Sequence, residues 1–188
     1  MPNEEYLREV VVGELKPHNG PINLVEYDSR WPELFQKESD RIRLVLGDKA
    51  LQIEHVGSTS VPGLCAKPII DIVLVVENSA DEDSYVPELE AAGYTLKIRE
   101  PDWYEHRLFK GPDTDINMHV FSKGTLEVER MICFRDWLRS NQNDRNKYAD
   151  VKRSLAKRNW KYVQDYADAK TSIVEEIMNR ATASLMNK

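Results

Sequence analysis

At 188 residues, with 41% hydrophobic and 31% charged side chains, the chain has the composition of a soluble globular protein and can bury a core of its own. No apolar run reaches the ~20 residues of a membrane span, and three glutamates and an arginine among the first nine residues argue against a secretory signal. Two cysteines, Cys65 and Cys133, are too few for a disulfide framework or a cysteine-bound metal cluster. We therefore expect a cytoplasmic protein that does not bind membranes.

Charge is unevenly distributed along the chain. Residues 1–122 contain 12 Lys/Arg and 23 Asp/Glu, a balance of −11, whereas residues 123–188 contain 14 and 9, a balance of +5. The basic stretch is either a set of solvated helix faces or a lobe that faces an anionic ligand. The net charge of −6 argues against binding to duplex nucleic acid, which depends on neutralising phosphates.

The first part of the chain is predicted to contain an arm, a helix and two strands. The expected elements are an arm (1–22, with an extended stretch at 10–12), a helix (28–46) and strands (51–56 and 69–76). Asp28 or Ser29 is expected to cap the helix, and Gly47 to end it. The second strand is an almost unbroken β-branched run, which is typical of a central strand buried on both faces.

The second part changes from short strands to helices. The expected elements are a helix (81–92), strands (94–99, 105–110 and 116–121) and helices (125–140, 144–158 and 163–186). No Gly or Pro follows Gly124, and apolar residues recur there at helical spacing. The sequence therefore predicts an α+β protein. A mixed five-stranded sheet with flanking helices forms a core (23–122), and a C-terminal helical region (123–188) packs on it.

A hydroxyl-rich turn, Gly57-Ser58-Thr59-Ser60, follows the first predicted strand. Gly57 lets the backbone approach a ligand, and hydroxyls with successive backbone N–H groups can cradle a phosphate. An ordinary turn or a helix N-cap has the same composition, so that alternative stays open. The turn lacks the Gly-Lys-Ser/Thr ending of common NTPase loops and the three-glycine fingerprint of dinucleotide-binding proteins.

Asp71 stands inside the apolar run of the predicted central strand. An unpaired buried carboxylate is costly, so Asp71 must be paired, hydrogen-bonded, bound to a metal or placed at an open strand end. Mg²⁺ favours one or two carboxylates together with phosphate oxygens. A second ligand on the same face would come two residues later, and that position is Val73, which cannot bind a metal.

Polar residues alternate along the last predicted strand, which places Asp115, Asn117 and His119 on one face. Such a face lines a cleft, or it is the solvent side of an edge strand. His119 is therefore a candidate metal ligand or base. His55 competes for that role, although its simplest function is to hydrogen-bond to the Gly-Ser turn and fix it.

Several cations can meet an anionic ligand. Lys170 lies in the middle of the apolar stripe of the last predicted helix. It either snorkels to the surface or reaches inward to a phosphate or carboxylate. Lys67, Arg107 and Lys123 are further candidates, because each lies close in sequence to a strand end.

A set of segments spread over about residues 22–180 matches the signature of a known family. They are HVGSTSVPGL at 55–64, AKPIIDI at 66–72, LVEYD at 24–28, WP at 31–32, LF at 34–35, NMHVF at 117–121, Arg130, FRDWLR at 134–139 and YA at 148–149. Together they closely resemble the GrpB family, also called UPF0157. This family is similar in fold to the nucleotidyltransferase superfamily, and related domains occur fused to dephospho-CoA kinase.

The resemblance implies a role for each matching residue. In the superfamily a Gly-Ser turn contacts the nucleotide polyphosphate, and carboxylates on the next strand and on a later one hold divalent metal. Carried over, Gly57 and Ser58 are the phosphate turn and Asp71 is the first metal ligand. The chain departs from the pattern at Val73 and on the later strand, which offers His119 in place of an acid. One carboxylate and one histidine imply a weakly held Mg²⁺ or a softer ion such as Mn²⁺ or Zn²⁺.

Three hypotheses follow. The first is a nucleotidyltransferase that uses Mg²⁺ or another divalent cation to transfer NMP from a nucleoside triphosphate to a small acceptor. Its catalytic and metal-binding residues are Asp71 and His119, and its phosphate-binding residues are Gly57, Ser58, Thr59, Lys67 and Lys170. The second is a non-catalytic module that binds a nucleotide or a CoA precursor. The third is a structural or chaperone-like protein, for which the sequence offers no exposed apolar stripe. A small-molecule nucleotide is the expected partner.

Overall fold

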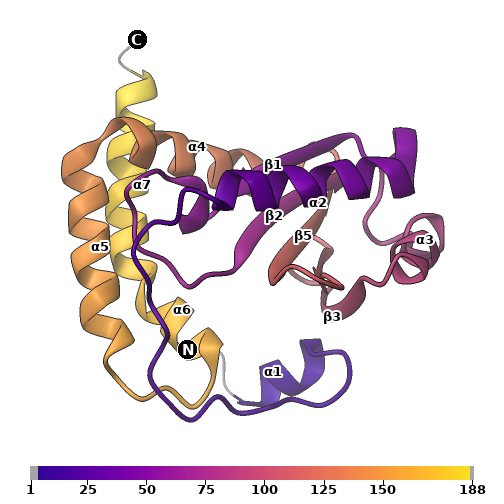
Figure 1. Cartoon of the computed structure of the whole chain (residues 1–188), viewed down its shortest axis with the longest axis horizontal. Coiled ribbons are helices and arrows are strands. Elements are labelled where there is room, and N and C mark those ends of the chain that lie inside the picture. The colour runs from indigo at the N-terminus through magenta and orange to yellow at the C-terminus, as the bar shows by residue number, and fades with distance from the viewer. Residues whose placement is uncertain (1–3, 187–188) are drawn as a thin grey trace.

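Five strands form one mixed sheet in the order β1-β2-β5-β4-β3 in the computed structural model, which describes residues 4–186 (Figure 1). The strands are β1 (Gln52–Val56), β2 (Ile70–Val76), β3 (Thr95–Glu100), β4 (His106–Lys110) and β5 (Ile116–Ser122). The central strands β2 and β5 run parallel, and the other neighbours are antiparallel. The predicted α+β architecture with a mixed sheet is confirmed, and each strand end lies within one residue of its expected place.

Helices precede, flank and follow the sheet (Figure 1). They are α1 (Glu4–Val10), α2 (Trp31–Leu46), α3 (Val86–Ala91), α4 (Leu126–Ser140), α5 (Gln142–Ala156), α6 (Val163–Ala169) and α7 (Thr171–Met186). Helix α4 lies along part of the sheet, and α5, α6 and α7 stand at one end of it (Figure 1). No helix within residues 4–186 combines the length and apolar character needed to cross a bilayer.

The N-terminal arm differs from its prediction. The prediction of an extended stretch at 10–12 is wrong for Val10, which is the last residue of the helix α1. This helix buries Leu7 and Val10, three residues apart on one face. Of residues 10–12, Val11 and Val12 lie after the helix and contact β3. Val11 forms a bridge with Ile98, and the backbone N–H of Val12 donates to the carbonyl of Lys97 at 2.8 Å.

Two predicted helices are interrupted. The helix expected at 81–92 starts as a 3₁₀ turn, Glu82–Ser84, and becomes α-helical only at Val86, because Pro87 has no N–H to continue an earlier helix. The helix expected at 163–186 divides into α6 and α7. At Lys170 the backbone N–H bonds to the carbonyl of Ala167, three residues back, so the last turn of α6 tightens.

The helix α2 covers one face of the sheet. It begins at Trp31 with Arg30 as its N-cap residue; Asp28 instead accepts the backbone N–H of Arg30 at 2.9 Å and also its guanidinium. Gly47 ends it at a φ of 55°, as predicted. Apolar residues of α2 and α3 bury this face together with alternate residues of the central strands, namely Ile42, Leu46, Leu89, Ile70, Ile72, Leu74, Met118 and Val120.

The opposite face is covered only in part. There α4 packs Val128 onto a small buried cluster of Val56, Val73, Val75 and Phe121. The same helix joins α5 and α7 around the segment that follows β1, where Val61 and Leu64 pack against Leu138 and Ile177. The helical region and the sheet therefore share buried side chains.

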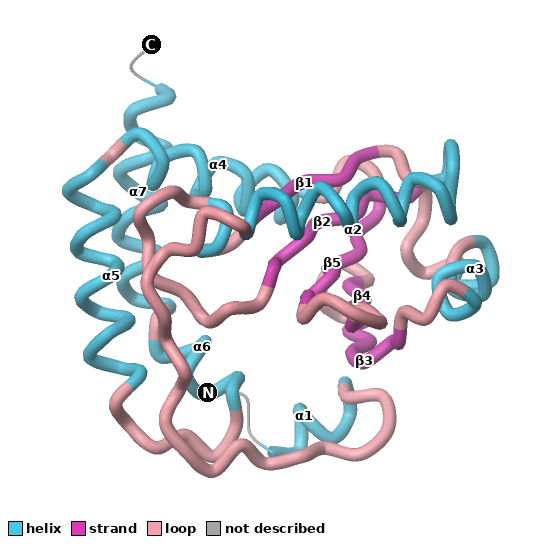
Figure 2. Tube along the Cα trace, viewed as in Figure 1, coloured by secondary structure: helices cyan, strands magenta, loops and turns pink. Residues whose placement is uncertain are grey.

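The N-terminal arm bridges the two ends of the molecule. Between α1 and α2 the chain runs past α6 and α5 (Figure 2). Gly20 and Trp160 exchange backbone hydrogen bonds of 3.2 and 2.9 Å, and the N–H of Ile22 donates to Ala156 at 3.0 Å. At its other end the arm bonds to β3 through Val12. The arm thus spans the open half of the sheet face.

Candidate functional site

The site lies on the half of the sheet face that α4 leaves open. In the parallel ladder Asp71 of β2 pairs with Asn117 of β5, and Val73 with His119, so these four side chains share one face. The amide of Asn117 donates to Asp71 Oδ1 at 3.2 Å, and His119 Nε2 lies 3.6 Å from the same oxygen. The structure therefore brings together the two residues predicted as catalytic and metal-binding.

The close approach of the Asp71 carboxylate to the backbone of the turn requires glycine at position 57. Its φ is 69°, and a Cβ on it would lie 2.4 Å from Asp71 Oδ2. The carboxylate is thus packed directly against the backbone of the turn, an approach that only glycine permits. Gly57 was predicted to let the backbone approach a ligand; the group that approaches it here is the carboxylate of Asp71.

The hydroxyls of the turn have different partners. Ser58 Oγ lies 2.8 Å from the ammonium of Lys152, and Ser58 lines the cleft. Thr59 Oγ1 lies 3.0 Å from His55 Nε2, and the His55 ring stacks on Phe35 of α2. Burial lowers the pKa of His55 to about 4. His55 therefore holds the turn through a hydrogen bond, as its simplest interpretation predicted. The hydroxyl of Thr59, a predicted phosphate ligand, is already hydrogen-bonded to His55.

A chain of hydrogen bonds leads from His119 away from the cleft. His119 Nδ1 lies 3.0 Å from His106 Nε2, and His106 Nδ1 lies 2.6 Å from Glu100 Oε2. The other oxygen of Glu100 accepts the hydroxyl of Tyr6 in α1. His106 and Glu100 were not singled out from the sequence, because their contact with His119 depends on the pairing of β3, β4 and β5.

Burial and neighbouring charges set the protonation of these groups. Burial lowers the pKa of His106 to about 4 despite the opposing effect of Glu100. Burial acts to raise the pKa of Asp71, but the hydrogen bond and charge of His119, with Lys67 and Asn117, outweigh it and hold the pKa below its ordinary value. At neutral pH the site thus presents an ionised Asp71 and a neutral His106.

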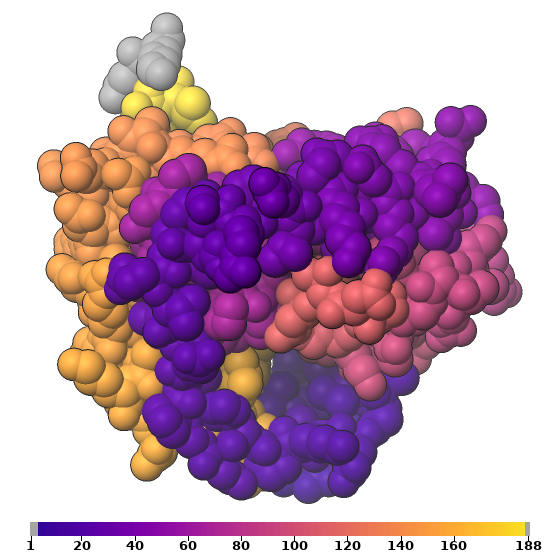
Figure 3. Space-filling model, in the orientation of Figure 1, coloured from indigo at the N-terminus to yellow at the C-terminus, as the bar shows by residue number. Residues whose placement is uncertain are grey.

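The face opens into a cleft of about 870 Å³, bounded by β2, β4, β5, α6 and the N-terminal arm. In the space-filling view the surface is hollowed between the arm and the body of the sheet (Figure 3). Six lysines line the cleft: Lys16, Lys67, Lys97, Lys110, Lys152 and Lys170. Glu14 and Asp71 are the carboxylates among its lining residues, so the cleft is strongly cationic.

Lys67 and Lys170 meet beside one aromatic ring. The ammonium of Lys170 lies 4.5 Å from the centroid of Tyr166, and that of Lys67 lies 6.0 Å from it. Burial lowers the pKa of Lys170 to about 8, and burial together with the charge of Lys170 lowers that of Lys67. Both predicted phosphate-binding lysines therefore face the cleft and repel each other there.

Lys152 of α5 is a cleft residue that the sequence analysis did not single out. It is 1% exposed, and its ammonium contacts Ser58 Oγ and the carbonyl of Cys65. Burial lowers its pKa to about 7. A signal was available, because Lys152 stands four residues after the buried Tyr148 and three before the buried Leu155 on one helix face.

Two other predicted cations lie outside the cleft. Arg107 is buried on the opposite side of β4, where it pairs with Glu82 and Glu105. Lys123 is exposed beside Glu77. Proximity to a strand end was therefore a poor guide for both, since it does not specify the face on which a side chain emerges.

Asp71 and His119 alone are too few to hold a metal ion, so a bound ligand would have to supply further coordinating atoms. Within residues 4–186, no group of three or more His, Cys, Asp and Glu side chains is placed to hold a metal ion. The 3.6 Å between Asp71 Oδ1 and His119 Nε2 suits two ligands that each lie about 2.1 Å from one ion. Phosphate oxygens and water would complete its coordination, as Mg²⁺ commonly requires.

The chain is similar to known proteins in sequence and in fold. The family model described as "GrpB protein" matches residues 21–180. The chain is 71% identical to a UPF0157 protein of Halalkalibacterium halodurans, over 96% of this chain and 93% of that protein. It is 32% identical to dephospho-CoA kinase of Mycolicibacterium paratuberculosis over 73% of this chain and 40% of that protein. Among solved structures it is similar to the conserved protein GrpB from Enterococcus faecalis, with 31% identity and a TM-score of 0.73, over 87% of this chain and 99% of that one.

Proposed function

The chain belongs to the GrpB family, and from that premise we propose that its cleft binds the polyphosphate of a nucleoside triphosphate with a divalent cation and transfers the nucleotidyl group to a small acceptor. The observation that carries the proposal is the charge of the cleft. Six lysines and two carboxylates line it, and one of the two, Asp71, faces His119. Cations of this number in a partly enclosed space favour a polyanion.

The residues divide the work by position. Asp71 and His119 would hold the cation, which neutralises phosphate charge and polarises the phosphorus under attack. Lys152 and Ser58 lie on one side of Asp71, and Lys110 reaches Asn117 Oδ1 at 2.8 Å on the other. A nucleophilic atom of the acceptor would bond to the α-phosphorus and lose its proton to water. The bond from that phosphorus to the α,β-bridging oxygen would break, and pyrophosphate would leave against the lysines.

A second function, binding without transfer, is favoured by Val73. This residue stands where the superfamily pattern has its second carboxylate, and it is fully buried beneath α4. A cleft with one acidic metal ligand retains its affinity for polyphosphate but loses part of the charge stabilisation that transfer needs. The match to part of a dephospho-CoA kinase adds a CoA precursor to the candidate ligands.

The two functions are separated by binding and turnover measured together. We expect calorimetry with each of the four nucleoside triphosphates, in Mg²⁺ and in Mn²⁺, to detect at least one ligand, and pyrophosphate release to report transfer. Lys170→Gln weakens binding, whereas Lys123→Gln, which removes an exposed lysine outside the cleft, leaves it unchanged. Binding that persists in EDTA without pyrophosphate release supports the second function. Absence of binding by all four nucleotides contradicts the first function, and absence of binding by a CoA precursor as well contradicts the second.

A further inference from the structure

We propose that Glu100 and His106 are positioning residues that hold His119 as its Nδ1–H tautomer, so that the Nε2 lone pair faces Asp71 and the cleft. The inference rests on the proposed function, because it concerns the same pair of residues. It adds two side chains from β3 and β4 to a site otherwise built on β2 and β5.

The direction of each hydrogen bond follows from the chemistry of its partner. An ionised carboxylate can only accept, so His106 Nδ1, at 2.6 Å from Glu100 Oε2, carries the proton of that bond. His106 is 3% exposed, and burial favours its neutral form against the opposing effect of Glu100, so its Nε2 carries a lone pair that accepts. His119 Nδ1, at 3.0 Å from it, must then donate. A neutral His119 is left with its lone pair on Nε2.

The surroundings hold His106 in this orientation. Its ring stacks on Phe121 with centroids 4.9 Å apart, and Trp103 packs against it in a T-shaped arrangement with centroids 5.1 Å apart. On the far side of Glu100, the hydroxyl of Tyr6 donates to the second carboxylate oxygen. The orientation of His119 is thus fixed by packing and by a hydrogen bond from the N-terminal arm.

The consequence is a pair of acceptors that face each other across 3.6 Å. While His119 is neutral, neither Asp71 Oδ1 nor the Nε2 lone pair can donate to the other, so the space between them favours a cation. A proton that enters this space makes His119 the charged donor that lowers the pKa of Asp71, and a metal ion would take the place of that proton. A carboxylate hydrogen-bonded behind a ligating histidine raises the basicity of that ligand, and loss of such a partner commonly costs about 10- to 100-fold in metal affinity. Glu100 acts here through one intervening imidazole.

The test is the tautomer of His119 in the metal-free protein, read from ¹⁵N shifts of the imidazole nitrogens. We expect the Nδ1–H form in the wild type and a shift toward Nε2–H in Glu100→Gln, whose side chain can also donate. Glu105→Gln, which removes a carboxylate that bonds to Arg107 instead, leaves the tautomer unchanged. An Nε2–H tautomer in the wild type overturns the inference, and so does a tautomer that Glu100→Gln fails to shift.

A titration with Mn²⁺ on the same samples separates this inference from the proposed function. We expect Glu100→Gln to weaken Mn²⁺ binding by about tenfold or more, and Glu105→Gln to leave it unchanged. If the tautomers behave as expected but the wild type binds no Mn²⁺ even with nucleotide present, the positioning role of Glu100 and His106 is supported and the proposed cation site is refuted. Wild-type affinity for Mn²⁺ in Glu100→Gln with a shifted tautomer overturns the link between positioning and affinity. The spectrum of each variant also shows directly whether it is folded.

Discussion

The two halves of one sheet face have opposite chemistry, although they belong to the same strands. Beneath α4 the face is apolar and closed, with Val73, Val75 and Phe121 fully or almost fully buried. One pleat away, Asp71 and His119 are partly exposed in a cationic cleft. The boundary between the halves falls between Asp71 and Val73, two residues apart on β2. A helix placed over one half thus decides which positions can carry chemistry.

The cover that α4 provides accounts for the apolar residue at position 73. A charged residue at position 73 would lie under α4, where it cannot be solvated. His119 is the register partner of Val73 on the neighbouring strand, and it faces the open half. The histidine therefore supplies the second polar contact to Asp71 from a position that α4 does not cover.

The largest expected effect comes from placing a carboxylate in the closed half. Val73→Asp buries an unpaired charge, so we expect the free energy of unfolding to fall by about 3–5 kcal/mol in chemical denaturation. Although Val73→Asp places a second carboxylate two residues after Asp71, we do not expect it to strengthen Mn²⁺ binding. A Val73→Asp protein of wild-type stability that binds Mn²⁺ more tightly would show that α4 does not close this half.

The next effect concerns the contact between the turn and Asp71. Gly57→Ala forces an alanine into a φ of 69° and brings its Cβ against the carboxylate, so we expect a loss of stability of about 2 kcal/mol or more. Displacement of Asp71 should also weaken Mn²⁺ binding. Gly13→Ala is the matched control, because Gly13 also has a positive φ, 92°, but nothing lies within 4 Å of its Cβ position. Equal effects of the two substitutions would contradict the contact.

The open half should respond to pH through its lysines. Burial lowers the pKa of Lys152 to about 7 and that of Lys170 to about 8, so both lose charge as the pH rises through these values. Above about pH 7.5 a terminal phosphate, with a pKa near 6, is already fully ionised. We therefore expect the affinity for ATP, measured by calorimetry, to fall by about tenfold between pH 7.5 and 9.5. A Lys170→Gln protein should show a smaller fall, and an unchanged slope would refute the assignment.

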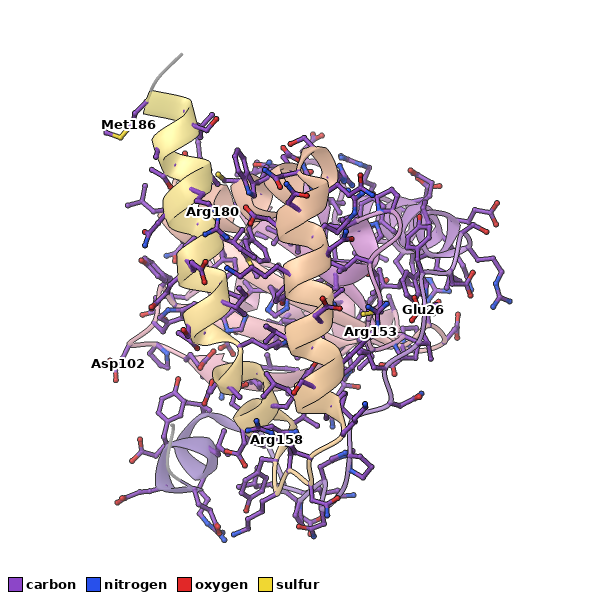
Figure 4. The ribbon with its side chains drawn as sticks, turned by 90° about the vertical axis from the view of Figure 1, so that its left-hand side faces the viewer. Glu26, Asp102, Arg153, Arg158, Arg180 and Met186 are labelled. Carbon is purple, nitrogen blue, oxygen red and sulfur yellow. The ribbon has the colours of Figure 1, made fainter. Side chains whose placement is uncertain are left out.

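The smallest effect is expected on the outer side of α5. Arg153 follows Lys152 in sequence but points away from the cleft toward Glu26, at 3.1 and 3.2 Å from its two carboxylate oxygens (Figure 4). An exposed pair of this kind contributes about 0–1 kcal/mol. Arg153→Gln should therefore lower the free energy of unfolding by no more than about 1 kcal/mol. It should leave the affinity for ATP unchanged. A large loss of affinity would mean that the cationic surface extends around the helix.

Local pattern was sufficient for the strands and for the pair Asp71 and His119. The β-branched run of β2 and the alternation of β5 place both residues on strand faces, and the Gly57 turn follows from its composition. The contact of Glu100 with His106 was beyond local pattern, because it depends on a hairpin whose register shifts between Leu96 and Ile98. A one-residue change in register would move each side chain to the other face.

The walls of the cleft show the same limit. Lys170 was singled out by its place in an apolar stripe, and that reasoning applies equally to Lys152, whose role was nevertheless missed. The arm was predicted only as an extended stretch followed by a loop, yet Leu7 and residues 11–16 line the cleft. Their placement depends on backbone bonds to β3 and to Trp160, partners distant in the sequence.

We propose that Asp71 and His119 together bind a divalent cation and, with it, a nucleotide. The most direct measurement is a titration of Mn²⁺ and ATP into the wild type and into Asp71→Asn, followed by paramagnetic resonance of the bound ion. Asn is isosteric with Asp, so we expect the variant to keep the fold, with an unchanged circular dichroism spectrum of the apoprotein. We expect only the wild type to bind Mn²⁺ together with ATP. Equal Mn²⁺ binding by both proteins would contradict the claim.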